Sequence, residues 1–355
     1  LRAYTVNASS WESTVRGLLK LTGLGYQGVH VFVILSGFLQ MWTSRDRKRD
    51  AYEYYVRRFL RLYPLYWLAI LGVVALNLVI HGNLGATPIQ VFGAFLGYAP
   101  LLSLNPSFWF MMLIVQLYLL FPILREVLGT VKEREFLAGT GAVTVLFLFL
   151  LADRMPWAGF FAGCWLFEFS LGMVMANHRS RVESLLRGIR SIILLLLAYL
   201  LGLGLSSFPQ TWALGRPLYG AALTLLLWSI YNTVRGMGGF GGLNGMLVFI
   251  GRNSFAMFLI NQPFIQEYYL LLGNRDLVFM NPIIGNPRNF GTLSISRYLM
   301  VELSYVILVI FLSYLLTEVE RRIAERVSSW GWKRVPGESA LKKGEHSTFP
   351  MVGSV

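Results

Sequence analysis

Three arginines close to residue 60 are the strongest candidates for chemistry in this sequence. Arg57, Arg58 and Arg61 lie in the segment YVRRFLRLYPLYW, at the start of a long apolar run. A spacing of three places Arg58 and Arg61 on one face of a helix, where two guanidinium groups form a bidentate site for phosphate or carboxylate. Anchoring of a helix end at the cytoplasmic membrane surface is the alternative. Tyr63 and Pro64 follow directly and favour a shaped helix start over a loose basic loop.

A histidine and a pair of small residues form the second candidate, in GYQGVHVFVILSGFL. His30 carries an imidazole, which titrates near neutral pH, so it is a candidate catalytic base. A structural histidine near the outer membrane surface is the competing interpretation. Ser36 and Gly37 lie about two turns further along the same helix, where small residues also allow two helices to pack closely. A role on a substrate path and a role in packing both stay open for Ser36.

Further candidates interrupt apolar runs, where a bilayer makes polar groups costly. They are Trp109, Gln116, Glu168, Arg216, Asn261 and Glu302. Arg216 could neutralise either Glu168 or Glu302, so structural pairing and a substrate path both remain possible. Trp109 suits an aromatic belt near the outer surface, and Gln116, deep in hydrocarbon, requires a partner. No spacing matches a metal site, a phosphate-binding glycine loop or a nucleotide fingerprint.

Transmembrane helices are the elements that must position these residues. The chain of 355 residues is 55% hydrophobic and only 14% charged, whereas a soluble domain has about 25% charged residues. Nine apolar runs reach the length of a spanning helix with their flanks. We therefore predict an all-α, polytopic bundle with nine visible spans. The runs are Val31–Met41, Leu62–Ile80, Phe108–Leu124, Phe136–Ala152, Trp157–Ala176, Ile192–Phe208, Leu218–Tyr231, Leu243–Leu272 and Tyr298–Thr317.

The placement of basic residues predicts the orientation of the bundle. The net charge is +13, but the basic clusters lie just beyond the ends of apolar runs, as in cytoplasmic membrane loops, which argues against nucleic-acid binding. With these clusters inside, the loop His81–Thr87 lies outside. Pro88–Leu104, an apolar stretch broken by glycine and proline, must then re-enter or lie at the interface rather than cross. The clusters are Arg45–Arg61, Arg125–Arg134, Arg179–Arg190 and Arg321–Lys343.

Three segments follow from this topology. Residues 1–25 form an extracytoplasmic segment, residues 26–322 a membrane domain, and residues 323–355 a polar cytoplasmic tail. Nine spans with a cytoplasmic tail leave residues 1–25 outside without a segment that could export them. One further span upstream of Leu1 is therefore expected.

Five segments together resemble the bacterial acyltransferase-3 family of integral membrane O-acyltransferases, and the resemblance covers nearly the whole chain. The segments are GVHVFVILSGFL, RRFLRLYPLYWL, SFWF with LYLLFP, GRNSFAMFLINQPF and SYLLTEVE. The resemblance implies ten spans in the bacterial inner (plasma) membrane and no bound cofactor. It also implies a cytoplasmic acyl-CoA donor, commonly acetyl-CoA, and a carbohydrate acceptor. Arg58 and Arg61 match the family's paired arginines, which engage the acyl-CoA phosphates, and Ser36 and Gly37 match its SGF signature.

The chain also departs from the family pattern. The family histidine that serves as catalytic base follows a basic residue by about ten positions on the first helix, and this chain has no such pair. Family members often carry histidine where Asn261 stands and glutamate where Gln116 stands. The chain is thus either a divergent branch whose base lies upstream or one whose activity has decayed, and a replacement of the missing base by His30 stays open.

The resulting functional expectation is transfer of an acyl group from acyl-CoA to a sugar hydroxyl of a surface polysaccharide or related glycan. The competing class is a transporter or flippase for a lipid-linked sugar, or a non-catalytic membrane partner in polysaccharide export. Few charges near the bilayer midplane and no matching pair of broken helices count against transport.

Overall fold

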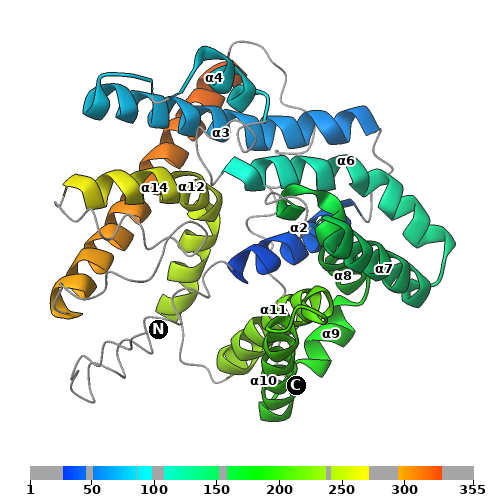
Figure 1. Ribbon diagram of the computed structural model, residues 1–355. Helices are drawn as coiled ribbons and strands as arrows, with labels where there is room; N and C mark the ends of the chain where they lie inside the picture. Colours follow the sequence, from blue (N-terminus) through cyan, green and yellow to red (C-terminus); the bar gives the residue numbers. More distant parts are fainter. Residues whose placement is uncertain are drawn as a thin grey trace.

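The computed structural model describes residues 27–44, 51–84, 86–97, 108–151, 158–236, 241–271 and 295–329, and every regular element within these ranges is a helix (Figure 1). The all-α prediction is confirmed for this part of the chain. The predicted outer segment 1–25, the loop after residue 271 and the last part of the tail lie outside the described residues.

The helices follow the apolar runs of the sequence. Six of them, α3, α6, α7, α10, α11 and α14, contain stretches long and apolar enough to cross a membrane, and α2 and part of α12 are shorter apolar helices. Each of the nine predicted runs falls on a helical element, but nine spans are not confirmed by these criteria. The bounds are α2 Gly28–Ser44, α3 Ala51–His81, α4 Pro88–Phe95, α6 Trp109–Thr130, α7 Glu133–Leu151, η3 Ala158–Phe160, η4 Ala162–Trp165, α8 Leu166–Asn177, α9 Arg179–Leu185, α10 Ile189–Ser206, α11 Trp212–Gly236, α12 Gly241–Leu271 and α14 Ile295–Ser329.

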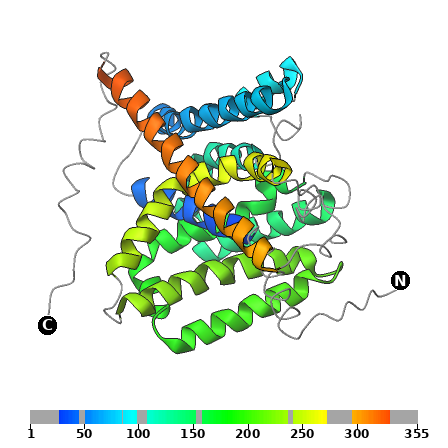
Figure 2. The same cartoon turned by 90° about the vertical axis from the view of Figure 1, so that its left-hand side faces the viewer.

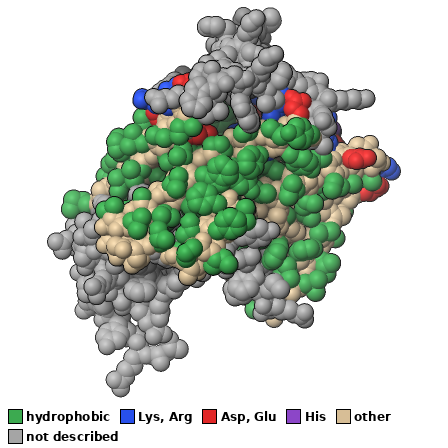
Figure 3. All heavy atoms as spheres, turned by 90° about the horizontal axis from the view of Figure 1, so that it is seen from above, with side chains coloured by type: hydrophobic (Ala, Val, Ile, Leu, Met, Phe, Trp, Pro, Cys, Tyr) green, Lys and Arg blue, Asp and Glu red, His purple; other side chains and the backbone are tan. Residues whose placement is uncertain are grey.

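Many large apolar side chains lie exposed on the outside of the bundle. On α10, Leu194 is 66% and Leu201 60% exposed, which would be costly in water but is favourable against lipid. From above, apolar side chains cover the visible face and charged side chains gather at its rim (Figure 3). The chain is therefore a multi-pass membrane protein.

Helix α2 lies in the middle of the bundle, against α6, α8 and α11 (Figure 1). Two glycines let it approach α8 closely. A Cβ on Gly37 would lie 2.0 Å from the carbonyl oxygen of Phe169, and one on Gly172 would lie 2.0 Å from that of Ile34. The two helices thus meet backbone to backbone, and Gly37 has a packing role.

The run Trp157–Ala176 differs from the continuous span that its composition predicts. The structure has two short 3₁₀ turns, η3 and η4, followed by the 12-residue helix α8. The side chain of Gln116 on α6 makes this possible. Its Nε2 donates to the carbonyl oxygen of Phe160 (2.9 Å) and its Oε1 accepts from the amide of Ala162 (3.1 Å). Irregular backbone inside a membrane bundle persists where protein groups satisfy it in this way.

The described part of Pro88–Leu104 forms the short helix α4. Its eight residues extend about 12 Å, which is too short to cross a bilayer. The Tyr66 hydroxyl donates to the Ala94 carbonyl (2.7 Å) and the Trp67 indole to that of Phe95 (3.0 Å), so α4 packs on α3. Whether the rest of this stretch re-enters the membrane falls outside the described residues.

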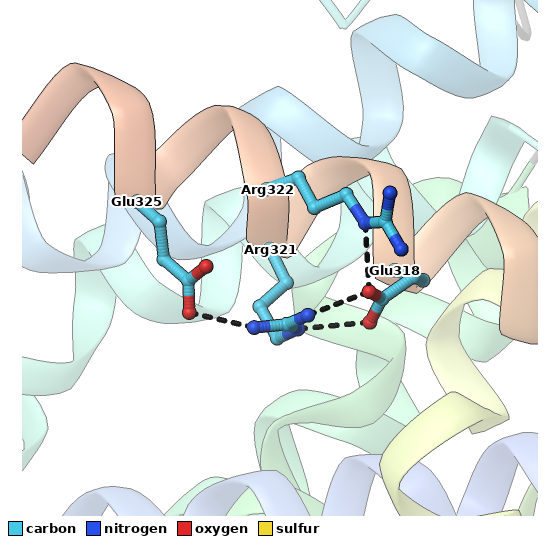
Figure 4. A network of polar contacts seen from close by, with 4 residues as sticks. All are labelled: Glu318, Arg321, Arg322 and Glu325. Carbon is cyan, nitrogen blue, oxygen red and sulfur yellow. Dashed lines mark hydrogen bonds and ion pairs between the residues drawn. The ribbon is translucent and has the colours of Figure 1, made fainter.

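Helix α14 crosses the bundle diagonally and ends on the same side as the start of α3 (Figure 2). Near its end Arg321 bonds to Glu318 (2.5 Å) and Glu325 (2.6 Å), and Arg322 also bonds to Glu318 (2.9 Å; Figure 4). The helix continues to Ser329, so the boundary predicted at residue 322 falls inside it.

Candidate active site

Arg58 is held in place by three helices. Its guanidinium carbon lies 5.5 Å from the ring centre of Tyr54 on α3 and 5.6 Å from that of Tyr118 on α6. Its Nη2 donates to the Thr43 hydroxyl on α2 (3.4 Å). Aromatic rings and a hydroxyl stabilise the cation without neutralising it. The side chain is therefore oriented and can still bind an anion.

The other two arginines of the predicted group differ from Arg58 in their environment. Arg57 forms an ion pair with Glu53, one turn earlier on α3. Arg61 is exposed and interacts electrostatically with Glu320 of α14. Because Arg61 follows Arg58 by three positions, both lie on one side of α3. The predicted bidentate arrangement is thus compatible with the helix geometry.

A fourth arginine lies at the same end of α2 and escaped the sequence analysis. The guanidinium carbon of Arg179, on α9, lies 4.9 Å from the ring centre of Trp42, and its Nε donates to Glu183 (2.8 Å). Arg58 and Arg179 thus both contact the last turn of α2, where the helix dipole favours positive charge. The only signal in the sequence was the basic cluster around Arg179.

A second group of polar residues is buried around His30, at the opposite end of α2 from Arg58 and Arg179. The imidazole Nδ1 lies 3.1 Å from Oε1 of Glu168 on α8, and Nε2 lies 3.2 Å from the hydroxyl of Tyr219 on α11. His30 and Glu168 are completely buried. One imidazole thereby links three helices, which is the structural role weighed for it, and it also joins a carboxylate to a phenol.

Arg216 and two tryptophans complete this buried group. The Arg216 guanidinium carbon lies 4.5 Å from the ring centre of Trp165. Trp165 in turn lies 4.8 Å from the His30 ring and 6.1 Å from Trp109, between ring centres. Trp109 is only 8% exposed, which argues against the lipid-facing aromatic belt that we expected for it. Arg216 acts electrostatically on His30, so one cation lies close to the imidazole.

Local sequence explains how these side chains fit together. A Cβ on Gly220 would lie 2.4 Å from the His30 Nδ1, so only glycine leaves room for the imidazole beside α11. The Gln116 amide fixes the turns that lead to Trp165 and Glu168. A glutamine at this position is thus explained by the backbone that it satisfies.

The predicted residues therefore fall into two groups and a remainder. His30, Glu168, Arg216, Trp109 and Gln116 come together, whereas Arg57, Arg58 and Arg61 lie at the cytoplasmic end that we predicted for α3. Ser36 is partly buried on α2. Asn261 on α12 receives a hydrogen bond on its carbonyl oxygen from the Tyr305 hydroxyl of α14 (2.5 Å). The Glu302 side chain lies outside the described residues.

Tyr219 and Trp165 are the members of the buried group that the sequence analysis missed. A signal for Tyr219 existed, because it follows Arg216 by three positions in GRPLYG and so shares its helix face. Trp165 offered none, since one tryptophan within an apolar run is ordinary.

Comparison with known proteins identifies the family of this membrane protein. The family described as an acyltransferase domain, acyltransferase-3, matches residues 1–318. The chain belongs to this family and is an acyltransferase enzyme. The resemblance found in the sequence motifs is thus confirmed.

Two curated relatives have the same kind of activity in their names. Acyltransferase MdmB of Streptomyces mycarofaciens is 27% identical over 319 residues, which cover 82% of this chain and 79% of the relative. The putative acetyltransferase ORF330 of Acidianus two-tailed virus is 23% identical over 251 residues, 66% of this chain and 72% of the relative. No solved structure matches the chain.

Proposed function

We propose that this protein transfers an acyl group, in the simplest case acetyl, from cytoplasmic acyl-CoA to a sugar hydroxyl of a surface glycan. The observation that carries the proposal is the oriented Arg58 side chain, which is held by Thr43, Tyr54 and Tyr118. Together with the exposed Arg61 it offers two guanidinium groups to the phosphates of coenzyme A.

The direction of transfer follows from the positions of Arg58, beside the end of α2, and of His30, at its start. Thr43, which contacts Arg58, follows His30 by 13 positions, which is about 20 Å along a helix. Coenzyme A carries its thioester at the end of a long, flexible pantetheine arm, separate from its phosphates. With the phosphates at Arg58, that arm brings the thioester into the bundle toward His30. The acceptor hydroxyl then meets the thioester beside the buried polar group.

Exclusion of water supports transfer over hydrolysis at this position. His30 and Glu168 are fully buried, and Trp109 and Trp165 pack around them. A site without bulk water favours attack by a bound hydroxyl on the thioester. The inner-membrane location and the cytoplasmic C-terminus belong to the same proposal and rest on the distribution of basic residues.

Binding of acetyl-CoA to the purified, detergent-solubilised protein tests the donor site. We expect the double variant Arg58→Ala and Arg61→Ala to bind acetyl-CoA at least 10-fold more weakly, because each lost charge-assisted hydrogen bond is worth about 1.5–3 kcal/mol. Arg190→Ala is the matched control, since Arg190 is an exposed arginine in the first turn of α10.

Wild-type affinity of the double variant, in protein that elutes as a single folded species, would overturn the donor proposal. It would favour the transporter or non-catalytic alternative. Equal losses in the double variant and in Arg190→Ala would also count against it, because a nonspecific charge effect would then explain both.

A further inference from the structure

A cavity of about 430 Å³ lies between the start of α7, the second half of α8, the short helix α9 and the middle of α11. Helix α8 packs against the other three, and the four helices lie together on one side of the bundle (Figure 1). The volume falls within the roughly 300–1,000 Å³ of ligand pockets. None of the candidate residues of the sequence analysis lines this cavity, so it is separate from the two groups at the ends of α2.

Most of the wall of this cavity is apolar. Seven of the ten lining residues carry apolar side chains; Met175 and Leu186 are buried, whereas Leu185 is 67% exposed. Apolar walls that are open to the surroundings are costly in water and favourable against hydrocarbon. The occupant that fits them therefore contains an acyl chain.

The other three lining residues are polar and carry charges of both signs. They are Glu133 at the start of α7, His178 directly after α8, and Arg181 in α9. The His178 Nε2 lies 2.7 Å from Oε2 of Glu133. Arg181 is exposed, and Glu183 of the same helix pairs with Arg179 instead (2.8 Å). The cavity thus offers a carboxylate and a guanidinium group to one occupant.

The Glu133 carboxylate has room for a further donor. It is 36% exposed, and the described donors beside it are the His178 imidazole at 2.7 Å and the Asn177 amide at 3.5 Å. A carboxylate has about four lone-pair sites, so it can also accept from an ammonium group. The guanidinium of Arg181 is suited to a phosphate, which it can bind through two hydrogen bonds.

These charged residues lie where lipid headgroups are expected. Helix α7 begins and α8 ends at the cavity, and both ends adjoin the basic clusters Arg125–Arg134 and Arg179–Arg190, which we assign to the cytoplasmic membrane surface. Leu171 precedes His178 by seven positions, which is about 10 Å along a helix. The apolar wall therefore extends from headgroup depth toward the hydrocarbon.

We propose that this cavity binds one phosphatidylethanolamine molecule of the cytoplasmic leaflet. The ammonium group of the lipid donates to Glu133, and its phosphate binds Arg181. One acyl chain lies along Leu171 and Val174 of α8, and the other stays in the bilayer. Phosphatidylglycerol lacks the ammonium group, and the methylated ammonium of phosphatidylcholine has no N–H to donate. The site does not depend on the proposed acyl transfer, because it concerns lipid binding alone.

Competition among three lipids with identical acyl chains tests the headgroup preference. The purified, detergent-solubilised protein is mixed with equal amounts of phosphatidylethanolamine, phosphatidylcholine and phosphatidylglycerol, and native mass spectrometry identifies the lipid that stays bound. We expect one phosphatidylethanolamine per chain, retained about 10-fold more than either other lipid, because only its headgroup makes charge-assisted hydrogen bonds to both Glu133 and Arg181.

Two charge variants test the two contacts. Glu133→Gln should lower retention of phosphatidylethanolamine about 10-fold, to the level of phosphatidylcholine, because the ammonium loses its anionic partner. Glu135→Gln is the matched control, since Glu135 is exposed in the same first turn of α7 and does not line the cavity. Arg181→Ala should weaken phosphatidylethanolamine and phosphatidylglycerol alike, whereas Arg187→Ala, at an exposed position after α9, should bind as the wild type does.

Val174→Trp tests the cavity itself, because an indole would occupy the space beside α8. We expect this variant to lose the bound phosphatidylethanolamine and to melt at the wild-type temperature in lipid-free detergent. Equal retention of the three lipids by the wild type, or wild-type binding by either Glu133→Gln or Val174→Trp, would overturn the site. Equal losses in Glu133→Gln and Glu135→Gln would also overturn it, because surface charge would then explain both. Acetyl-CoA binding by the Arg58 and Arg61 variants decides the donor site separately.

Discussion

Gln116 uses its whole amide group to hold the backbone next to the buried polar group. The NH₂ donates to the carbonyl oxygens of Met112 (3.1 Å) and Phe160 (2.9 Å), and the oxygen accepts from the Ala162 amide (3.1 Å). A carboxylate of the same shape could accept but could not donate. The amide at this position is therefore a requirement of the fold.

We predict that Gln116→Glu destabilises the protein. The new carboxylate would face the Phe160 carbonyl oxygen, at a cost of about 1–3 kcal/mol for the lost and unsatisfied hydrogen bonds. Thermal unfolding in detergent measures this effect as a lowered melting temperature. Gln90→Glu in the first turn of α4 is a control with the same chemical change, because the Gln90 Oε1 accepts hydrogen bonds from Thr87, which a carboxylate can also accept. A drop no larger than in the control would contradict the prediction.

Single residues also show how much of the site could be predicted from the sequence. His30 stood out because an imidazole is rare in an apolar run, and Gln116 because a buried amide needs a partner. The contact of His30 with Glu168 joins residues 138 positions apart, and no local pattern encodes such a distance. Tyr219 stayed hidden because a tyrosine in a membrane helix usually serves packing or the interface.

Helices α2 and α8 show how far the packing of helices could be predicted from the sequence. Their crossing depends on Gly37 and Gly172, which face the backbone of the opposite helix. Small residues predicted close packing on α2, whereas the partner helix was not predictable from composition. This crossing matters for the site, because α2 carries His30 and α8 carries Glu168.

We predict that Gly172→Ala separates the two helices and weakens both fold and transfer. The added methyl group would meet backbone atoms of Ile34 and Phe38, at 2.0 and 2.8 Å, and backbone cannot move aside as a side chain can. Overpacking of this kind costs about 1–3 kcal/mol. Melting temperature and acetyl transfer, measured on the same preparation, check the prediction.

Gly139→Ala on α7 provides the comparison, since nothing lies within 4 Å of the added methyl group. Alanine favours a helix over glycine by up to about 1 kcal/mol, so this variant should melt at or above the wild-type temperature. If Gly172→Ala melts as high as Gly139→Ala, the close crossing of α2 and α8 is wrong.

The 3₁₀ turns before α8 mark where element prediction failed. The run from Trp157 is as apolar as a spanning helix, and composition alone cannot distinguish the two. The difference comes from Gln116, whose amide supplies the backbone partners that a regular helix would supply itself. A tertiary contact thus overrode the local pattern. The long runs that became α3, α6 and α10 were predictable, because a continuous apolar helix satisfies its own backbone hydrogen bonds in the bilayer.

At the scale of the whole molecule, the orientation in the membrane still rests on charge placement. Asn83 lies in the loop after α3, and Ser180 lies in α9 within a basic cluster; both are exposed. The positive-inside rule assigns them to opposite sides. The single cysteine, Cys164, is fully buried, so the wild-type chain provides an unreactive background for labelling.

We therefore predict that Asn83→Cys reacts with a membrane-impermeant maleimide in intact cells, whereas Ser180→Cys reacts only after the membrane is permeabilised. Labelling of the wild-type chain under both conditions gives the background. Reaction of both cysteines from the outside, or of Ser180→Cys alone, would invalidate the assignment of the basic clusters to the cytoplasm.

Arg58 of α3 contacts Thr43 at the end of α2, whereas His30 lies at the start of α2, and this separation has a consequence for the cell. Under the proposed function, the nucleotide part of the donor stays on the side where it is made, and only the acyl group moves on to the acceptor. Free coenzyme A then returns to the metabolic pool without a dedicated exporter. A glycan that has already left the cytoplasm could in this way be acylated from a cytoplasmic supply.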